Sequence, residues 1–415
     1  MSKLQTVHFK NGLTVYLYTD KRRHSTFFQF NTFCGGLSKH FFYDGKEISL
    51  PDGVAHILEH YIVECNKEGN FLEKLGQKQM STNASTSPFA TSYYFEAIED
   101  IPYGIQTMLQ GIYHVSFTEE NLAKIKKPIL QEVRGKLDNK FYHANRMRMD
   151  QLFHSIDFRD VGGTLEEIQG TTLEELETLY RAFYQPNNQF IVVAGNFDLK
   201  EVLSLIEDFY DSISIEKHTV EIIPYQEEKT VAKKKGSFSF PTPLTYAELS
   251  FKIDISSYTP SALLDLDFYM HSFYSSSFGT TSPLYQEFVD QKIVFDGIHY
   301  GDVKLENYLI LSIGAYTSNP KRFREGVLEE IQSLKHLDSD KFLLDQKDSI
   351  VNLVLRDESI FHMIIPFIHN IIIYHYPYLD KIEDIEKLND TDYQKMIRSI
   401  DFSHFTYFEI LSPKK

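Results

Sequence analysis

The most informative part of this sequence is a turn followed by an apolar run, Pro51-Asp52-Gly53-Val54-Ala55-His56-Ile57-Leu58-Glu59-His60. Proline, aspartate and glycine favour a turn, and the residues after them predict a helix over residues 54–63. Positions i and i+4 of a helix lie on the same face, so His56 and His60 can bind one metal ion while Glu59 projects beside them. This spacing is typical of a metal-dependent hydrolase.

The residue types in this helix favour zinc. A catalytic zinc has three protein ligands and keeps its fourth position for water, and a carboxylate beside it acts as general base on that water. The alternative is a packed or surface histidine pair, which a chain with 16 His can contain by chance. A third ligand candidate, Glu132, lies in a second predicted helix over residues 119–137, and this favours the metal site.

Length and composition predict a folded, multidomain chain. The 415 residues exceed one ordinary core, and 42% apolar and 24% charged residues are globular values. The net charge of −16 argues against a nucleic-acid partner. The most apolar region, residues 361–378, contains His and Pro that would be costly in lipid. We therefore predict a buried helix there and no membrane partner.

The order of the predicted elements indicates an α+β fold in two similar halves. Each half mixes strands with helices, whereas residues 213–240 have the charged and proline-containing composition of a linker. We predict an N-terminal domain over residues 1–215 that carries the metal site, a linker over 216–236, and a C-terminal domain over 237–415 without the zinc motif.

Cysteine usage and the first residues predict a cytoplasmic protein. The two cysteines, Cys34 and Cys65, are too few for a disulfide scaffold and suit a reducing compartment. The first residues run directly into a strand pattern and contain no apolar stretch of the signal-peptide type.

The segment over residues 51–60 resembles the signature of the inverted zincins of the pitrilysin and insulinase type, which include the mitochondrial processing peptidase. The resemblance implies that His56 and His60 are zinc ligands and that Glu59 is the general base. It also implies that Glu132, 72 positions after His60, is the third ligand of one zinc per chain. The fold that it implies is two homologous domains of the LuxS and processing-peptidase type, each a mostly antiparallel sheet packed with helices.

The stretch from Asn83 to Thr86, with residues 91–95 after it, is similar to the edge strand with which this family binds an extended peptide. Main-chain hydrogen bonds would align a peptide substrate as an added strand. The resemblance favours Asn83 and Ala84 as substrate-binding residues, although a turn-capping role for Asn83 is the alternative.

Two departures from the family pattern carry information. A glutamate that family members place seven residues before the third ligand is replaced by Ile125, which affects the support of the metal site. In the second half, Val289 and Asp296 occupy the positions of an arginine and a tyrosine that hold the substrate backbone, with Tyr300 as a conceivable substitute. A homologous zinc-less partner subunit would then supply this pair.

These observations predict a zinc-dependent endopeptidase that cleaves short unfolded peptides in an enclosed chamber. We expect the chain to be the catalytic subunit of a heterodimer. The alternative from another class is a non-catalytic structural or chaperone-like subunit of the same fold.

Overall fold

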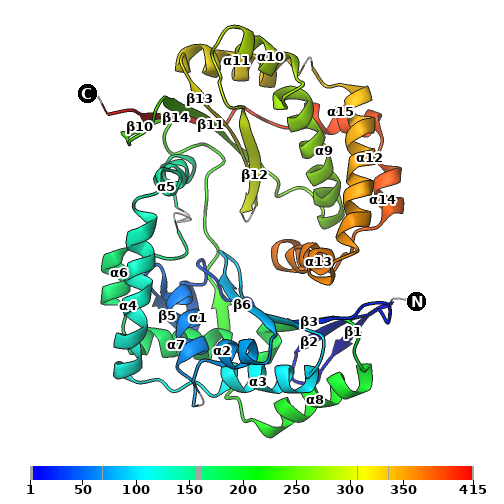
Figure 1. The fold of residues 1–415 in the computed structure, drawn as a ribbon. Helices are drawn as coiled ribbons and strands as arrows, with labels where there is room; N and C mark the ends of the chain where they lie inside the picture. Colours follow the sequence, from blue (N-terminus) through cyan, green and yellow to red (C-terminus); the bar gives the residue numbers. More distant parts are fainter. Residues whose placement is uncertain (1–2, 68, 156–159, 306, 335, 414–415) are drawn as a thin grey trace. The chain divides into compact units, whose positions relative to one another are not determined.

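The computed structural model describes residues 3–67, 69–155, 160–305, 307–334 and 336–413. The chain forms two compact units (Figure 1). Unit 1 comprises Met1–Asn139, Asp160–Pro224 and Asp357–Ile368, and unit 2 comprises Lys140–Arg159, Tyr225–Arg356 and His369–Lys415. No helix within the described ranges is long and apolar enough to cross a lipid bilayer.

Unit 1 is built on a mixed sheet with the order β1-β2-β8-β3-β7-β6, as far as the described residues show. The pair β2–β8 is parallel and the other neighbours are antiparallel. The strands are β1 (Lys3–His8), β2 (Thr14–Thr19), β3 (Thr26–Thr32), β6 (Ser81–Thr86), β7 (Thr91–Ala97) and β8 (Gln189–Gly195). A small second sheet contains β4 (His40–Tyr43), β5 (Lys46–Ser49) and β9 (Val220–Ile222).

Helices cover both faces of the large sheet of unit 1. Their apolar residues form one continuous core with β2, β3 and β7. The helices are α1 (Val54–Glu64), α2 (Phe71–Gln77), α3 (Ile101–Tyr113), α4 (Glu119–Lys136), α6 (Leu165–Gly170), α7 (Leu173–Phe183) and α8 (Leu199–Ser212), with a 3-10 turn at Pro186–Asn188. On the opposite face, the first part of α13 (Ile360–Tyr374) contacts the sheet through Phe361 against Phe27 and Phe367 against Tyr16.

The apolar region at residues 361–378 is a buried helix, as predicted. Helix α13 buries Ile364, Phe367 and Ile368. The helix continues through Pro366 and ends at Tyr374, and the next residue, His375, has a left-handed backbone with φ 50°, a conformation common just after a helix end.

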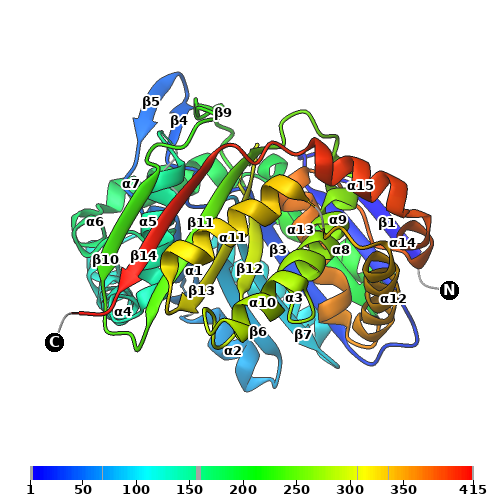
Figure 2. The same ribbon diagram turned by 90° about the horizontal axis from the view of Figure 1, so that it is seen from above.

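Unit 2 contains a sheet with the order β10-β14-β11-β13-β12, whose strands run side by side in Figure 2. They are β10 (Lys235–Ser239), β11 (Thr245–Asp254), β12 (His299–Leu305), β13 (Tyr308–Thr317) and β14 (Phe405–Leu411). The helices of the unit are α5 (Lys140–Leu152), α9 (Pro260–Phe278), α10 (Pro283–Asp290), α11 (Pro320–Ser333), α12 (Ser339–Arg356), α14 (Ile382–Lys387) and α15 (Asp390–Ser399).

The two sheets share one topology. In unit 2, the first strand in the chain pairs in parallel with the last, and the second, fourth and third strands follow in antiparallel order. In unit 1, β2, β8, β3, β7 and β6 repeat this order and these directions. The predicted fold class of two similar units, each a mostly antiparallel sheet packed with helices, is therefore confirmed. By topology, β12 is the counterpart of the edge strand β6.

The packing units do not coincide with the predicted ranges 1–215, 216–236 and 237–415, which stay a prediction about folding domains. Helix α5 belongs to unit 2, where Arg148 forms a bidentate pair with the buried Glu248 at 2.6 and 3.1 Å. Asp357–Ile368 returns to unit 1. The segment 216–236 also has ordered contacts, because β9 pairs with β4 and Glu227 is buried in unit 2.

Lys252 is the polar centre of unit 2. Its side chain is 0% exposed, and its ammonium group lies 2.6 Å from Glu227, whose side chain is 2% exposed. The same ammonium donates to the carbonyl oxygens of Leu152 and Glu228 and lies over the rings of Phe153 and Tyr308. Burial lowers the pKa of Lys252, and the carboxylate of Glu227 opposes that shift.

Removal of the charge of Glu227 should destabilise unit 2. In Glu227→Gln the ammonium of Lys252 loses a buried counter-ion, which typically costs about 3 kcal/mol or more. We expect that loss in the free energy of unfolding measured by urea denaturation. Lys229→Ala is the control, because Lys229 is 70% exposed in its pair with Asp254 and such pairs contribute about 0–1 kcal/mol. Equal losses in the two variants would contradict this assignment.

Candidate metal centre

Helix α1 begins after Gly53, which has a left-handed backbone conformation and lies against the backbone of a second loop. Gly53 is the N-cap with φ 83°, and a Cβ atom there would lie 2.7 Å from the carbonyl oxygen of Gly162. Gly163 has φ 70°, and its Cβ would lie 2.7 Å from the carbonyl oxygen of Asp52. Two chain segments therefore meet backbone to backbone at the start of α1. The helix predicted over residues 54–63 is confirmed.

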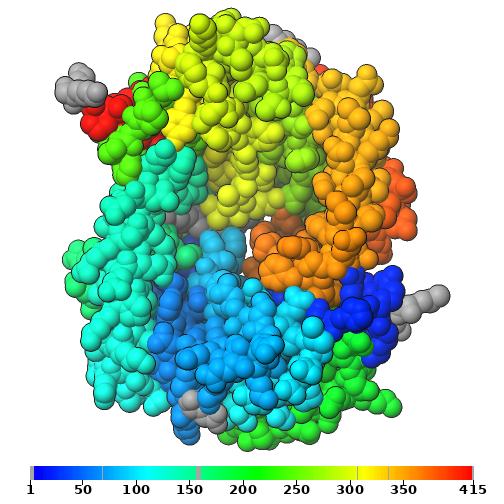
Figure 3. Space-filling model, viewed as in Figure 1, coloured from blue at the N-terminus to red at the C-terminus, as the bar shows by residue number. Residues whose placement is uncertain are grey.

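The structure brings His56, His60 and Glu132 together. Glu132 Oε2 lies 3.7 Å from Nε2 of His56 and 3.9 Å from Nε2 of His60. The centroids of the two imidazole rings are 4.8 Å apart, and the ring planes make an angle of 83°. Helix α1 packs against α4, which carries Glu132, and the atoms of α4 (teal) border those of the region around α1 (blue) in Figure 3. Within the described residues, these three form the group that could hold a metal ion.

The donor set fits zinc. Ligand atoms about 2.0–2.1 Å from one tetrahedral ion lie about 3.4 Å apart, so the observed separations of 3.7 and 3.9 Å need only a small adjustment. Two imidazoles and one carboxylate are a ligand set of catalytic zinc sites.

Burial keeps the two imidazoles neutral, as metal ligation requires. Desolvation, reinforced by the neighbouring His60, lowers the pKa of His56 to about 4. Desolvation also lowers the pKa of His60, although Glu132 acts in the opposite direction. The partial burial of Glu132 would raise the pKa of its carboxyl, but the hydrogen bond from Lys136 and the nearby His56 bring it below its usual range. Neutral nitrogens thus face an ionised carboxylate.

Glu59 lies on the same helix, beside the ligand candidates and 7% exposed. Desolvation raises the pKa of Glu59 to about 7, while a hydrogen bond from Thr86 opposes the shift. Thr86 Oγ1 donates to Glu59 Oε2 at 2.6 Å. The carboxyl group is therefore held through one oxygen, and a bound dication would favour its ionised form.

Strand β6 is the edge of the unit 1 sheet nearest to α1, with which it is in contact. Exposure alternates along the strand, so Ala84 and Thr86 share the face toward α1. Asn83 is exposed on the other face, so its side chain does not point to the histidine pair. The side chain of Ala84 therefore lies on the face of β6 that carries Thr86, and the side chain of Asn83 lies on the opposite face.

Three polar residues around the site were not predicted from the sequence. Thr86 and Asp160 come from distant parts of the chain, so no local pattern reveals their contacts with Glu59 and Lys136. Lys136 follows Glu132 by four positions, and this spacing is a readable signal for an ion pair on a helix.

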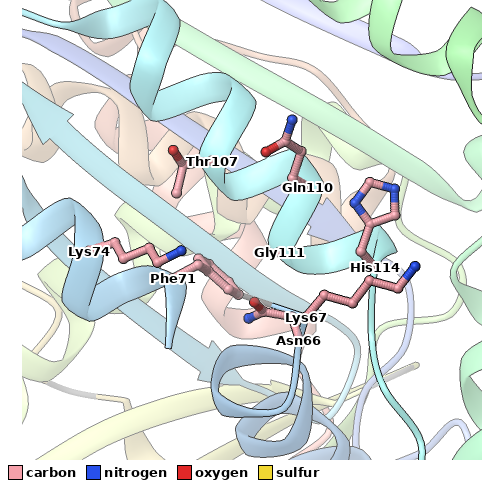
Figure 4. A pocket seen from close by; sticks show the side chains of 8 residues that line it. All are labelled: Asn66, Lys67, Phe71, Lys74, Thr107, Gln110, Gly111 and His114. Atoms are coloured by element: carbon pink, nitrogen blue, oxygen red, sulfur yellow. The ribbon is translucent and has the colours of Figure 1, made fainter. Parts of the chain in front are cut away.

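A separate hollow in unit 1 lies between the segment after α1 and helices α2 and α3 (Figure 4). Phe71 forms its floor, and Gly111 allows that ring to approach, because a Cβ atom there would lie 2.3 Å from Phe71. Lys67, Lys74 and His114 give the hollow a basic rim. None of the three candidate metal ligands is among its lining residues.

Two models of known protein families match this chain. Residues 44–158, which contain the histidine pair and Glu132, match the family model described as "Insulinase (Peptidase family M16)". Residues 171–347 match the model described as "Peptidase M16 inactive domain". The chain belongs to peptidase family M16. The resemblance to pitrilysin- and insulinase-type enzymes is therefore confirmed.

Individual M16 relatives cover most of the chain. The uncharacterized zinc protease YmfH of Bacillus subtilis is 24% identical over 326 residues, which are 76% of this chain and 75% of that protein. The zinc protease PqqE of Helicobacter pylori is 20% identical over 331 residues, 74% of this chain and 72% of that protein. A putative M16-like peptidase from Alicyclobacillus acidocaldarius superimposes with a TM-score of 0.90 at 23% identity, over 99% of both chains. The M16 fold thus extends over the whole chain.

Proposed function

We propose that this M16 chain is a zinc-dependent endopeptidase with His56, His60 and Glu132 as the ligands of one zinc and Glu59 as the general base. The observation that carries the proposal is the approach of Glu132 Oε2 to both imidazole nitrogens, with the carboxyl of Glu59 beside them. The names of relatives such as YmfH and PqqE, both zinc proteases, support the choice of metal.

The reaction follows from the positions of these groups. Bound zinc would supply a Lewis acid for a substrate carbonyl and lower the pKa of a coordinated water. Glu59 accepts the proton of the attacking water and returns it to the leaving amine, as a buried carboxylate near neutrality can do. Thr86 holds Oε2 of Glu59, so the other oxygen stays available for this transfer.

The edge strand β6 suits a peptide substrate. One edge of β6 pairs with β7, and no strand of the described residues pairs with its other edge. A peptide in extended form would add to this edge by main-chain hydrogen bonds along the stretch that contains Asn83 and Ala84, close to Thr86 and Glu59. Such binding requires an unfolded segment, which favours short flexible peptides admitted to an enclosed chamber over folded proteins.

Unit 2 carries no obvious group to hold the substrate carbonyl at the expected positions. Val289 lies on α10 with 40% of its side chain exposed, and Asp296 follows that helix. Neither an alkyl side chain nor a carboxylate donates a hydrogen bond to a developing oxyanion. We therefore propose a heterodimer, in which a homologous zinc-less subunit contributes an arginine and a tyrosine.

The alternative is a non-catalytic structural or chaperone-like subunit of the same fold. The match of residues 171–347 to a family model described as an inactive domain is compatible with this alternative. Retention of two imidazoles, a facing carboxylate and a buried Glu59 favours catalysis in unit 1. Metal analysis distinguishes the two: we expect one zinc per purified chain, and none under metal-replete conditions would support the scaffold.

We also propose a cytoplasmic location. Both cysteines are buried free thiols, as a reducing compartment maintains.

The partner requirement is tested by reconstitution. A related chain encoded next to this one, with an intact arginine–tyrosine pair and no histidine pair, should co-purify with it. We expect cleavage of a fluorogenic peptide by the mixture and little by either chain alone, because the oxyanion donors and the zinc would lie on different chains. Full activity of the isolated chain would contradict the heterodimer.

The general-base role is tested by Glu59→Gln in the active assembly. Zinc content should remain at one per chain, whereas kcat should fall about 10²–10⁴-fold, the usual contribution of general-base catalysis. Glu73→Gln, which changes an exposed glutamate in the first turn of α2, is the control and should keep activity. Turnover retained by the Glu59 variant would assign the base elsewhere.

The orienting role of Thr86 is tested by Thr86→Val, which keeps the shape and removes the hydroxyl. A hydrogen bond to a charged group contributes about 1.5–3 kcal/mol, so kcat should fall about tenfold or more while zinc content is unchanged. Thr82→Val changes the same face of the same strand and should leave kcat unaffected. A larger effect at residue 82 than at residue 86 would exclude the orienting role.

A further inference from the structure

The two carboxylate oxygens of Glu132 have different partners. Oε2 faces Nε2 of His56 and His60, while Oε1 lies 3.0 Å from the ammonium of Lys136, one helical turn further along α4. Zinc and the ammonium group would therefore bind opposite oxygens of one carboxylate. Such a division leaves one oxygen for the metal and holds the other.

Lys136 is itself held from outside its helix. Its ammonium lies 3.7 Å from Asp160 Oδ2, and the Asp160 side chain is only 16% exposed. Asp160 Oδ1 accepts a hydrogen bond from the backbone of Gly162 at 3.0 Å, which fixes the carboxylate in its own loop. A Cβ atom at Gly162 would lie 3.1 Å from the Lys136 ammonium, so the loop and the lysine are in close contact.

The same loop, residues 160–163, also contacts the helix that carries the histidines. Its two glycines meet the backbone of Asp52 and Gly53 at the N-cap of α1. Val161 packs against Gly36, where a Cβ atom would lie 2.8 Å from its side chain. The loop therefore connects the start of α1 with the end of α4, that is, the helix of the two histidines with the helix of the glutamate.

Elsewhere along α4 the described contacts give the ligands little polar support. Ile125, seven residues before Glu132 on the same helix, is fully buried in the apolar core. Nδ1 of His56 is buried without a hydrogen-bond partner among the described residues. Orientation of the ligand set therefore depends on groups at other positions, and metal ligands generally need such support.

We propose that Lys136, held by Asp160, is a positioning residue that fixes Glu132 with one oxygen toward the histidine pair. The proposal rests on the proposed zinc site. In this arrangement the ammonium restrains the long side chain of Glu132 and prevents it from presenting both oxygens to the ion. The loop at residues 160–163 sets the position of the ammonium relative to α1, so the spacing between the two ligand helices and the orientation of the third ligand are set together.

Lys136 could also weaken zinc binding, because its positive charge lies close to the proposed ion. A cation beside a ligand oxygen repels a dication and withdraws charge from the carboxylate. If that repulsion dominated, removal of the ammonium would tighten zinc binding. If positioning dominates, removal weakens it. The sign of the change in zinc affinity therefore separates the two effects.

The experiment measures zinc affinity of the full chain by competition with a chromogenic chelator, and the visible spectrum of the cobalt(II)-substituted chain. Lys136→Met keeps the length of the side chain and removes the charge, and Lys136→Arg is the conservative variant. Asp160→Asn tests the outer contact independently of α4. Lys124→Met is the matched control, because Lys124 lies on the same helix and pairs with Glu64 at 3.9 Å.

We expect Lys136→Met to weaken zinc binding roughly tenfold or more, as loss of a supporting contact usually does, and to change the cobalt spectrum. Lys136→Arg should restore most of the affinity. Asp160→Asn should weaken binding less, and it should add nothing in the Lys136→Met background, because it acts through Lys136. Lys124→Met should match the wild-type chain.

Unchanged or tighter zinc binding by Lys136→Met would overturn the proposal, as would a loss in Asp160→Asn that persists in full without Lys136. Circular dichroism and thermal midpoints confirm that each variant is folded. If the wild-type chain binds no zinc, the proposed function fails. If the wild-type chain binds zinc and the lysine variant binds it equally well, only the positioning role fails.

Discussion

The packing of helix α1 between helix α4 and the edge strand β6 is the constraint on which the candidate site depends. Tyr61 of α1 fixes the start of α4: its hydroxyl donates to the carbonyl oxygen of Ser116 at 2.9 Å and accepts from the amide of Thr118 at 2.7 Å. The Lys136–Asp160 pair lies at the other end of α4. Glu132 lies between these two points, so the register of α4 along α1 decides whether its carboxylate reaches the histidines.

The sequence predicted the parts of this site that depend on local periodicity. The spacing of His56, Glu59 and His60 implies one helical face, because i, i+3 and i+4 positions are neighbours on any α-helix. Glu132 was a candidate because it lies on a predicted helix, but its role as the third ligand rested on its distance along the chain in a resembling family, since nothing local connects it with the histidines. Thr86 was inaccessible because its partner is 27 positions away and the contact depends on how a strand edge packs on a helix.

The sequence also could not predict which sheet each helix packs against, because that depends on contacts between distant residues. The apolar composition of residues 361–378, interrupted by His and Pro, predicted a buried helix, but composition does not tell which sheet that helix covers. The ring contacts of Phe361 and Phe367 place its first part on the unit 1 sheet. Likewise, Arg148 pairs with the buried Glu248 and so holds α5 on the unit 2 sheet. Long-range ion pairs of this kind leave no signature in a single sequence.

Two units with one strand order carry different chemistry, which locates function in side chains and not in topology. In unit 1 the edge strand β6 ends at Thr86, and the helix beside it bears the histidine pair. The counterpart strand β12 instead presents Asp302 and Lys304, and Lys304 pairs with Asp267 of the neighbouring helix α9. Asp302 and Lys304 are thus engaged within unit 2. Among the described residues, the group that could hold a metal ion is formed by α1 and α4 of unit 1, so the difference between the two units that bears on the proposed hydrolysis lies beside the edge strand and not in the strand order.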